Sequence, residues 1–173
     1  GHILLSANGR DWTQQPVPTR AMLNRVVVNP DGRLFAVGHD GVVLLSKDQG
    51  RRWSIQHQAI SDQRPNILYD VAFVTPQRGY AIGAFGFMLV TEDAGQSWQA
   101  QDNALTQSGL HLNAIARLGD NGLIVVGERG LVAVSQDQGV TWKLSAPAYA
   151  GSFFGVLPTS ANTALVYGQR GRL

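Results

Sequence analysis

Short apolar runs separated by glycine-containing turns recur along the chain, and no helix-period apolar stripe of useful length lies between them. Runs of this length between turn residues are typical of β-strands. Three runs in a fixed order precede each full copy of a polar motif, and the tryptophan of the motif begins a further strand. We therefore expect four short strands per repeat, designated A to D. The expected A, B and C strands are 25–28, 34–37 and 42–45; 69–73, 80–82 and 87–90; and 112–116, 123–126 and 131–134.

The motif between strands C and D reads Ser/Thr-x-Asp-x-Gly-x-x-Trp. Its carboxylate can accept hydrogen bonds from backbone N–H groups, and its glycine permits a positive φ. The hydroxyl can tie the end of the strand to the turn, and the tryptophan brings a large ring that suits packing between repeats. We interpret these residues as structural, because equivalent turns of separate repeats cannot converge on one substrate or ion. They are Ser46, Asp48, Gly50 and Trp53; Thr91, Asp93, Gly95 and Trp98; and Ser135, Asp137, Gly139 and Trp142.

The spacing of the motif indicates the architecture. Tryptophans at positions 12, 53, 98 and 142 give steps of 41, 45 and 44 residues, and a shortened motif occupies residues 6–12. Four strands in a period of this length is the size of one β-propeller blade. The sequence predicts a single all-β domain, a propeller of four-stranded antiparallel blades, over the whole chain. The expected units are a half-blade at 1–15, blades at about 22–58, 66–101 and 110–145, and a half-blade at 152–173.

The two half-blades are complementary, because the first contains strands C and D and the last contains strands A and B. Residues 3–6 could pair with residues 164–167 and close a ring of four blades. Alternatively, the chain could be a piece of a larger propeller, which we favour because four blades is the smallest ring of this fold. Unpaired strand edges also invite pairing with a missing segment or with a second chain, so self-association is a further expectation.

The motif resembles the Asp-box, or bacterial neuraminidase, repeat. The longer unit at residues 67–98 resembles the photosystem II stability/assembly factor family of β-propellers, and this likeness covers nearly the whole chain. The resemblance implies a non-catalytic scaffold that binds a protein partner as an assembly or stability factor for a membrane or extracytoplasmic complex. It also implies an extracytoplasmic location, periplasmic or secreted, but it does not imply photosynthesis. Asp boxes occur in sialidases and xyloglucanases as well, so a fragment of such a glycoside hydrolase is the alternative.

Catalytic residues of the alternative function are difficult to find. Sialidases use an arginine triad, a tyrosine–glutamate pair and an acid/base aspartate, whereas the glutamates here are Glu92 and Glu128, and the Phe/Tyr-Arg-Ile-Pro motif is absent. Ordinary glycosidases need two opposed carboxyl groups. Asp40, Asp62, Asp102 and Glu128 could share one face of a propeller, but their spacing does not pair them. We predict no catalytic residue, and the sequence leans against an enzyme.

Composition excludes several other classes of function. The chain has 173 residues, a formal net charge of +2 and no cysteine, which excludes disulfides and thiolate metal sites and argues against nucleic-acid binding. The four histidines lack zinc-like spacing, so no metal or cofactor is expected. No apolar run is long enough to span a membrane, and residues 1–6 lack the basic segment and cleavage site of a signal peptide.

The candidate binding surface is the face that carries the D–A and B–C loops, because the motif turns lie on the opposite face of a propeller. Loops that vary in length and sequence on a rigid scaffold are common binding sites. We call this surface the loop face. The D–A loops are 14–22, 56–65, 100–110 and 145–151.

Arginines on these loops suggest the chemistry of the partner. Guanidinium groups pair well with carboxylates and stack on aromatic rings, so an acidic protein segment of a membrane complex is the predicted ligand. In the alternative interpretation, the arginines pair locally with Asp40, Asp62 and Glu128 and leave no patch. The candidate contact residues are Arg20, His39, His57, Arg64, Phe85, Arg129, Tyr149 and Arg170.

Overall fold

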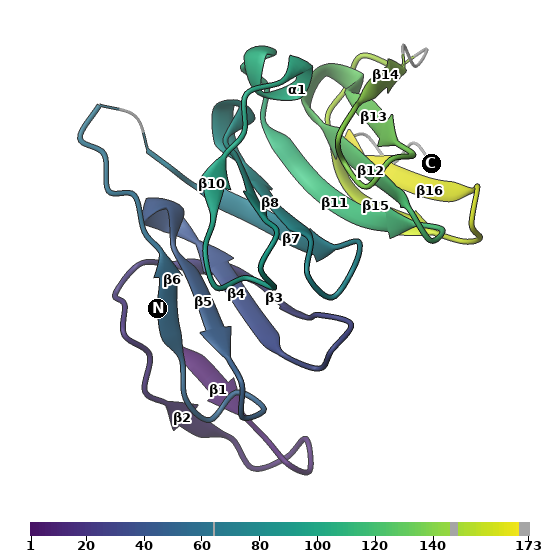
Figure 1. The fold of residues 1–173 in the computed structure, drawn as a ribbon. Coiled ribbons are helices and arrows are strands. Elements are labelled where there is room, and N and C mark those ends of the chain that lie inside the picture. Colours follow the sequence, from purple (N-terminus) through teal and green to yellow (C-terminus); the bar gives the residue numbers. More distant parts are fainter. Residues whose placement is uncertain (64, 146–148, 170–173) are drawn as a thin grey trace.

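The computed structural model describes residues 1–63, 65–145 and 149–169. Within these ranges, three four-stranded antiparallel sheets stand side by side, with a two-stranded sheet at each end of the row (Figure 1). The strands of each sheet follow one another in sequence order. This arrangement confirms the predicted all-β fold with propeller blades of four antiparallel strands.

The whole blades share one pattern, in which strands A and B are longer than strand D. Blade 1 contains β3 (Leu23–Val28), β4 (Leu34–Gly38), β5 (Val43–Ser46) and β6 (Ser54–His57). Blade 2 contains β7 (Leu68–Phe73), β8 (Gly79–Gly83), β9 (Met88–Thr91) and β10 (Gln99–Ala100). Blade 3 contains β11 (Leu112–Leu118), β12 (Gly122–Gly127), β13 (Val132–Ser135) and β14 (Lys143–Ser145).

The half-blades do not meet. The first consists of β1 (Ile3–Leu5) and β2 (Thr13–Gln15), and the last of β15 (Phe153–Pro158) and β16 (Ala164–Gly168). Among the described strands, β1 pairs only with β2 and β16 only with β15, and the two sheets lie at opposite ends of an open arc (Figure 1). Closure of a four-blade ring within the chain is therefore wrong, because the rotation at the seams between blades does not bring β16 round to β1.

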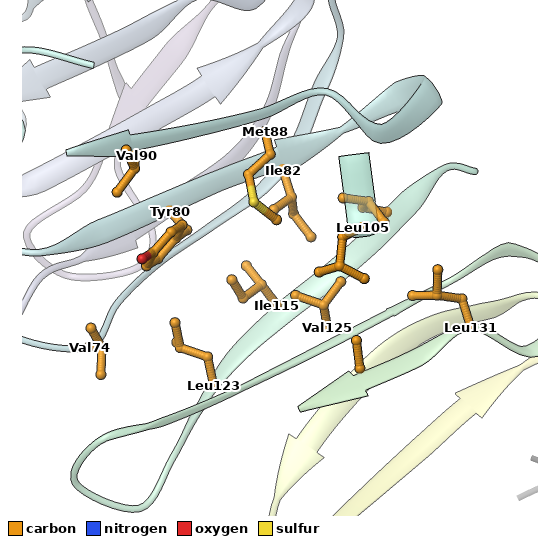
Figure 2. Close-up of a cluster of buried hydrophobic side chains, with 12 residues drawn as sticks. Val74, Tyr80, Ile82, Met88, Val90, Leu105, Ile115, Leu123, Val125 and Leu131 are labelled. Atoms are coloured by element: carbon orange, nitrogen blue, oxygen red, sulfur yellow. The ribbon is translucent and has the colours of Figure 1, made fainter. Parts of the chain in front are cut away.

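The seams between blades hold the hydrophobic core. Strand A is innermost, and β3 packs beside β7, β7 beside β11, and β11 beside β15. Figure 2 shows the seam between blades 2 and 3, where Tyr80, Ile82 and Met88 face Ile115 and residues of β12. Such burial of apolar side chains from both partners is the main stabilising contribution at a seam.

A short helix, α1 (Ala104–Gln107), closes one end of this seam. Its Leu105 is fully buried in the same cluster as Met88. Asn103 begins the helix with a capping box, since its side chain accepts hydrogen bonds from the Leu105 and Thr106 amides. The helix occupies the D–A loop after blade 2, at the top of Figure 1.

Aromatic rings on strand B are packed against the Asp-box glycine of the next blade. The ring of Tyr80 lies over Gly139, where a Cβ atom would come within 2.4 Å of the tyrosine Cζ. The Tyr80 hydroxyl donates to the carbonyl of Gln138 at 2.9 Å. Phe35 lies over Gly95 in the same way, and a Cβ atom on that glycine would come within 2.2 Å of the phenyl ring. The box glycine therefore provides space for the neighbouring blade as well as a positive φ.

Across the described ranges, no helix combines the length and the apolar character needed to pass through a membrane.

Candidate functional site

The Asp-box turns satisfy their own polar groups. The Thr91 hydroxyl donates to Asp93 Oδ1 at 2.9 Å and accepts from the Gly95 amide at 2.8 Å. Asp93 Oδ1 also accepts from the amide of Ser97 at 2.9 Å, and the Ser97 hydroxyl donates to Oδ2 at 2.6 Å. These carboxylates are thus occupied within their turns. Corresponding hydrogen bonds join Ser46, Asp48, Gly50 and Arg52 in blade 1, and Ser135, Asp137, Gly139 and Thr141 in blade 3.

The pKa values of the Asp-box aspartates agree with a structural role. Hydrogen bonds from the Arg52 side chain and amide hold the pKa of Asp48 at about 2, and bonds from Thr141 hold the pKa of Asp137 at about 2. A carboxylate with so low a pKa stays ionised at neutral pH and cannot act there as a general acid. The boxes therefore supply no acid/base pair.

The box tryptophans lie at the seams. Trp98 meets Phe35 of blade 1 edge-on with ring centroids 6.2 Å apart, and Trp142 meets Tyr80 of blade 2 at the same distance. The indole N–H of Trp53 donates to the Gly50 carbonyl at 2.9 Å. The indole nitrogens of Trp98 and Trp142 are buried and have no hydrogen-bond partner among the described residues. The rings of Trp98 and Trp142 thus contact neighbouring blades rather than a free surface.

On the loop face, the B–C connection of each of the three whole blades is a type I′ turn. Both central residues have positive φ, as this turn requires, and the residue after them donates to the carbonyl of the residue before them. In blade 2, the central residues Phe85 and Gly86 have φ of 55° and 75°, and the Phe87 amide donates to the Ala84 carbonyl at 2.9 Å. Equivalent pairs are Asp40–Gly41 in blade 1 and Arg129–Gly130 in blade 3.

Backbone hydrogen bonds fix the B–C turns on both sides. In blade 2, the Ala84 amide donates to the Ile67 carbonyl at 2.9 Å, just before strand A of the same blade. The Gly86 amide donates to the Leu110 carbonyl at 2.7 Å, just before strand A of the next blade. Blades 1 and 3 repeat both bonds. Side chains at the turn tips are thus presented by a rigid backbone rather than by a mobile loop.

Four side chains from blades 2 and 3 form one group on the loop face, which we call the loop-face cluster. The rings of Phe85 and His111 are steeply inclined with centroids 4.6 Å apart, and Tyr69 Oη lies 3.1 Å from His111 Nδ1. The amide of His111 donates to Glu128 Oε2 at 2.9 Å. Burial, and next the Glu128 carboxylate, raises the pKa of Tyr69, so its hydroxyl stays protonated at neutral pH.

The loop-face cluster contains Phe85, one residue of the predicted contact set, and lies beside Arg129, another residue of that set. Arg129 is exposed at the tip of the turn that also holds Glu128. Arg20 is exposed in the first D–A loop. Among the described residues, no ion pair joins Arg20 or Arg129 to a carboxylate, and Glu128 bonds to a backbone amide instead.

The other predicted contact residues are dispersed. His57 Nδ1 lies 2.7 Å from the Gly41 carbonyl, and His39 is partly buried at the start of the first B–C turn. The Tyr149 hydroxyl donates to the Gln169 carbonyl at 2.7 Å, and its ring packs on Phe153. These side chains take part in local structure. Arg64 and Arg170 lie outside the described residues.

A second polar group lies on the innermost strands. Asp70 of β7 accepts from the amides of Val71 and Ile115, at 2.9 and 3.0 Å, and its Oδ1 lies 3.1 Å from Arg25 Nε. Burial raises the pKa of Asp70, although the amides and Arg25 favour its ionised form. Sequence reasoning missed this link. The signal was present, because Arg25 and Asp70 occupy equivalent positions of adjacent strands with opposite charges.

The described residues offer little for metal or glycosidase chemistry. No group of three or more His, Asp or Glu side chains within them is placed to hold a metal ion. A hollow of about 640 Å³ lies on the opposite face between the first box and residues Gln49 and Arg51. Asp11 is the single carboxylate among the described residues that line it, whereas glycoside hydrolysis needs two.

Comparisons with known proteins point to one family. The model of the family described as photosynthesis system II assembly factor YCF48 matches residues 2–90 and 56–148. A structure of YCF48 bound to D1 peptide shares 18% identity with a TM-score of 0.71, over 94% of this chain and 53% of that chain. YCF48 from Cyanidioschyzon merolae shares 23% identity with a TM-score of 0.68, over 92% and 54%. No curated protein matches.

The likeness extends to enzymes of the same architecture. An ancestral GH74 enzyme shares 17% identity with a TM-score of 0.62, over 83% of this chain but 21% of that chain. At such identities, the structural matches establish the fold and not the activity. The chain spans about half the length of the two YCF48 structures.

Proposed function

This chain belongs to the photosynthesis system II assembly factor YCF48 family, and on that premise we propose that it is a non-catalytic propeller scaffold that binds a segment of a partner protein. The partner belongs to a membrane or extracytoplasmic complex whose assembly or stability the protein supports. A family structure with a bound D1 peptide supports the binding of a protein segment. The proposed site is the loop face.

The observation that carries this proposal is the rigid presentation of exposed side chains by the B–C turns. Main-chain bonds hold each turn to its own blade and to the next, so the turn tips keep their positions without a ligand. Such preorganisation lowers the entropy lost on binding. Arg129 stands at one tip without an ion-pair partner among the described residues, and Phe85 stands at the equivalent tip of blade 2.

The proposed ligand is an acidic segment. Arg20 and Arg129 are exposed in loops that share the loop face, and Glu128 bonds to the His111 amide rather than to an arginine. A guanidinium group that is not already paired can form a charge-assisted bond with a carboxylate of the partner. Contacts of this kind between exposed groups weaken as salt screens them, so binding should be strongly salt-dependent.

The test is capture of the partner from the membrane fraction of the source organism with the immobilised 173-residue chain. We expect one membrane-complex subunit to be enriched, and its recovery to fall with rising salt. Charge reversal by Arg20→Glu with Arg129→Glu should abolish recovery, whereas Arg51→Glu on the exposed box turn should not. Unchanged recovery with the double variant, when its melting curve matches that of the wild type, would exclude an acidic ligand at this face.

We also propose an extracytoplasmic location for the protein, in line with its family. Fractionation of source cells with an antibody against this chain tests the proposal. Recovery in the periplasmic or secreted fraction is the expected result, and recovery with cytoplasmic markers would contradict it.

A further inference from the structure

The residue at the tip of the B–C turn in blade 2 is unusual for its backbone conformation. The first central position of a type I′ turn requires a positive φ, which Asp and Asn tolerate and a bulky side chain disfavours. Asp40 holds this position in blade 1 with φ of 57°, whereas Phe85 holds it in blade 2 with φ of 55°. Both turns make the same backbone hydrogen bonds. The turn would therefore form equally well with Asp or Asn at position 85.

Phe85 does not use this position to fill the core. The residue is 40% exposed, and it lies on the loop face rather than in a seam. A large apolar side chain that is held in a disfavoured conformation and left partly in water points to a function outside the fold.

The other members of the loop-face cluster hold the phenyl ring in place. The His111 ring meets it at a centroid distance of 4.6 Å, and the Tyr69 hydroxyl is within hydrogen-bond distance of His111. Glu128 Oε2 in turn accepts from the His111 amide. These contacts make a fixed aromatic surface between two blades. The exposed Arg129 follows Glu128 directly in the same turn.

We propose that Phe85, supported by His111 and Tyr69, is the subsite for a large apolar or aromatic side chain of the partner segment. This inference rests on the proposed function and refines it: the ligand is an extended peptide that carries an acidic residue for Arg129 and a large apolar residue for Phe85. Arg129, which has no ion-pair partner in the described part of the chain, lies beside an exposed aromatic surface, and this favours the mixed peptide over a purely acidic one.

The experiment uses short fluorescein-labelled peptides of glycine and serine that contain one Asp and one Phe at varied spacing. Matched peptides replace the Phe by Ala or the Asp by Asn, and anisotropy gives the dissociation constants for the 173-residue chain. We expect the best Asp–Phe peptide to bind about tenfold more tightly than its Ala counterpart, as burial of a phenyl ring allows.

Two variants separate the subsites, and a third is the control. Phe85→Asn should remove the preference for Phe over Ala but keep the preference for Asp over Asn, and Arg129→Asn should do the reverse. Asp40→Asn should keep both preferences. Because Asn is favoured in this turn, neither Phe85→Asn nor Arg129→Asn should lower the melting temperature. A side chain with a purely structural role would instead lower it.

The outcomes distinguish failure of the apolar subsite from failure of the acidic ligand. If the wild type prefers Asp over Asn but not Phe over Ala, or if Phe85→Asn keeps the preference for Phe, the apolar subsite is wrong and the acidic ligand stands. If the wild type binds none of the peptides, both the subsite and the acidic peptide ligand are excluded.

Discussion

At the scale of single residues, two kinds of aspartate serve this fold in opposite environments. Asp137 is exposed at its turn, where Thr141 donates to it from both side chain and amide, and its pKa is about 2. Asp70 is buried between strands of three blades, and burial raises its pKa despite the contact with Arg25. The two carboxylates should therefore affect stability in opposite directions as the pH changes.

The first prediction follows from these pKa shifts. The folded chain keeps the proton of Asp70 to higher pH than the unfolded chain, so ionisation of Asp70 removes stability as the pH rises from about 4 through its raised pKa. The melting temperature of Asp70→Asn, relative to the wild type, should increase over that range. Asp137 shows the opposite behaviour, because its pKa is lowered to about 2. Its ionised carboxylate stabilises the fold above the ordinary pKa of aspartate, and this stability is lost as the pH falls toward 2. The melting temperature of Asp137→Asn should therefore approach that of the wild type on acidification.

Thermal denaturation followed by circular dichroism over a pH series measures both effects. Differences from the wild type that stay constant with pH in both variants would show that neither carboxylate has a shifted pKa in the folded chain.

The second prediction concerns the structural role of a box aspartate. Asp93→Ala removes the acceptor for the Gln96 and Ser97 amides, and we expect the free energy of unfolding to fall by about 0.5–2 kcal/mol. Asp93→Asn should retain most of the stability, because Asn8 in the shortened first box accepts from two amides at 2.9 Å. Chemical denaturation is the measurement. An alanine variant with wild-type stability would refute a structural role for Asp93.

The structural role of some of these residues could be predicted from the sequence, whereas that of others could not. The box residues repeat at a fixed period, so their common turn could be predicted without coordinates. The contacts of Asp70 with Ile115 and of His111 with Glu128 join single residues 45 and 17 positions apart, with no repetition to reveal them. The B–C loops that carry Phe85 and Glu128 could be predicted, but the loop-face cluster depends on how two blades are placed side by side.

At the scale of strands and turns, the hydrophobic pattern predicted the strands but not their irregularities. The register of strand A shifts at its second residue in every blade, for example between Leu68 and Asp70. A bulge of this kind turns one side chain out of the regular alternation, and here it is Tyr69, a member of the loop-face cluster. Apolar periodicity gives no sign of an extra residue, since the flanking residues remain apolar.

The third prediction compares two glycines with nearly the same positive φ. Gly139 and Gly32 have φ of 85° and 86°, but a Cβ at Gly139 would meet the Tyr80 ring at 2.4 Å and one at Gly32 would meet nothing within 4 Å. Gly32→Ala should lower the free energy of unfolding by about 1 kcal/mol, the penalty for a side chain at positive φ. Gly139→Ala should lose about 1–3 kcal/mol more through the clash at the seam.

Equilibrium unfolding in urea measures the two values. Equal losses in the two variants would show that the contact between Tyr80 and the box glycine adds nothing to the seam.

At the scale of the whole molecule, the open arc leaves strand edges without a neighbour. In the described part of the chain, β1 and β16 each pair on one side only. Exposed edges of this kind are prone to pair with another chain. We predict that the 173-residue chain associates with increasing concentration. Leu165→Lys, which adds a charge to the exposed side of β16, should weaken association, and Val140→Lys on a box turn should not.

Sedimentation velocity over a range of concentrations tests this prediction. A single monomeric species for the wild type at all concentrations would rule out association through these edges.

The main-chain bond between a B–C turn and the next blade has a consequence for how such proteins diversify. The Gly86 amide meets the Leu110 carbonyl, so this part of the seam makes no demand on side-chain identity beyond the glycine. A blade that is duplicated or exchanged in register would therefore keep this hydrogen bond with its neighbour, whichever side chain stands at the tip of its turn. Side chains at the turn tips can then differ between blades, as Asp40, Phe85 and Arg129 do, over the same backbone hydrogen bonds.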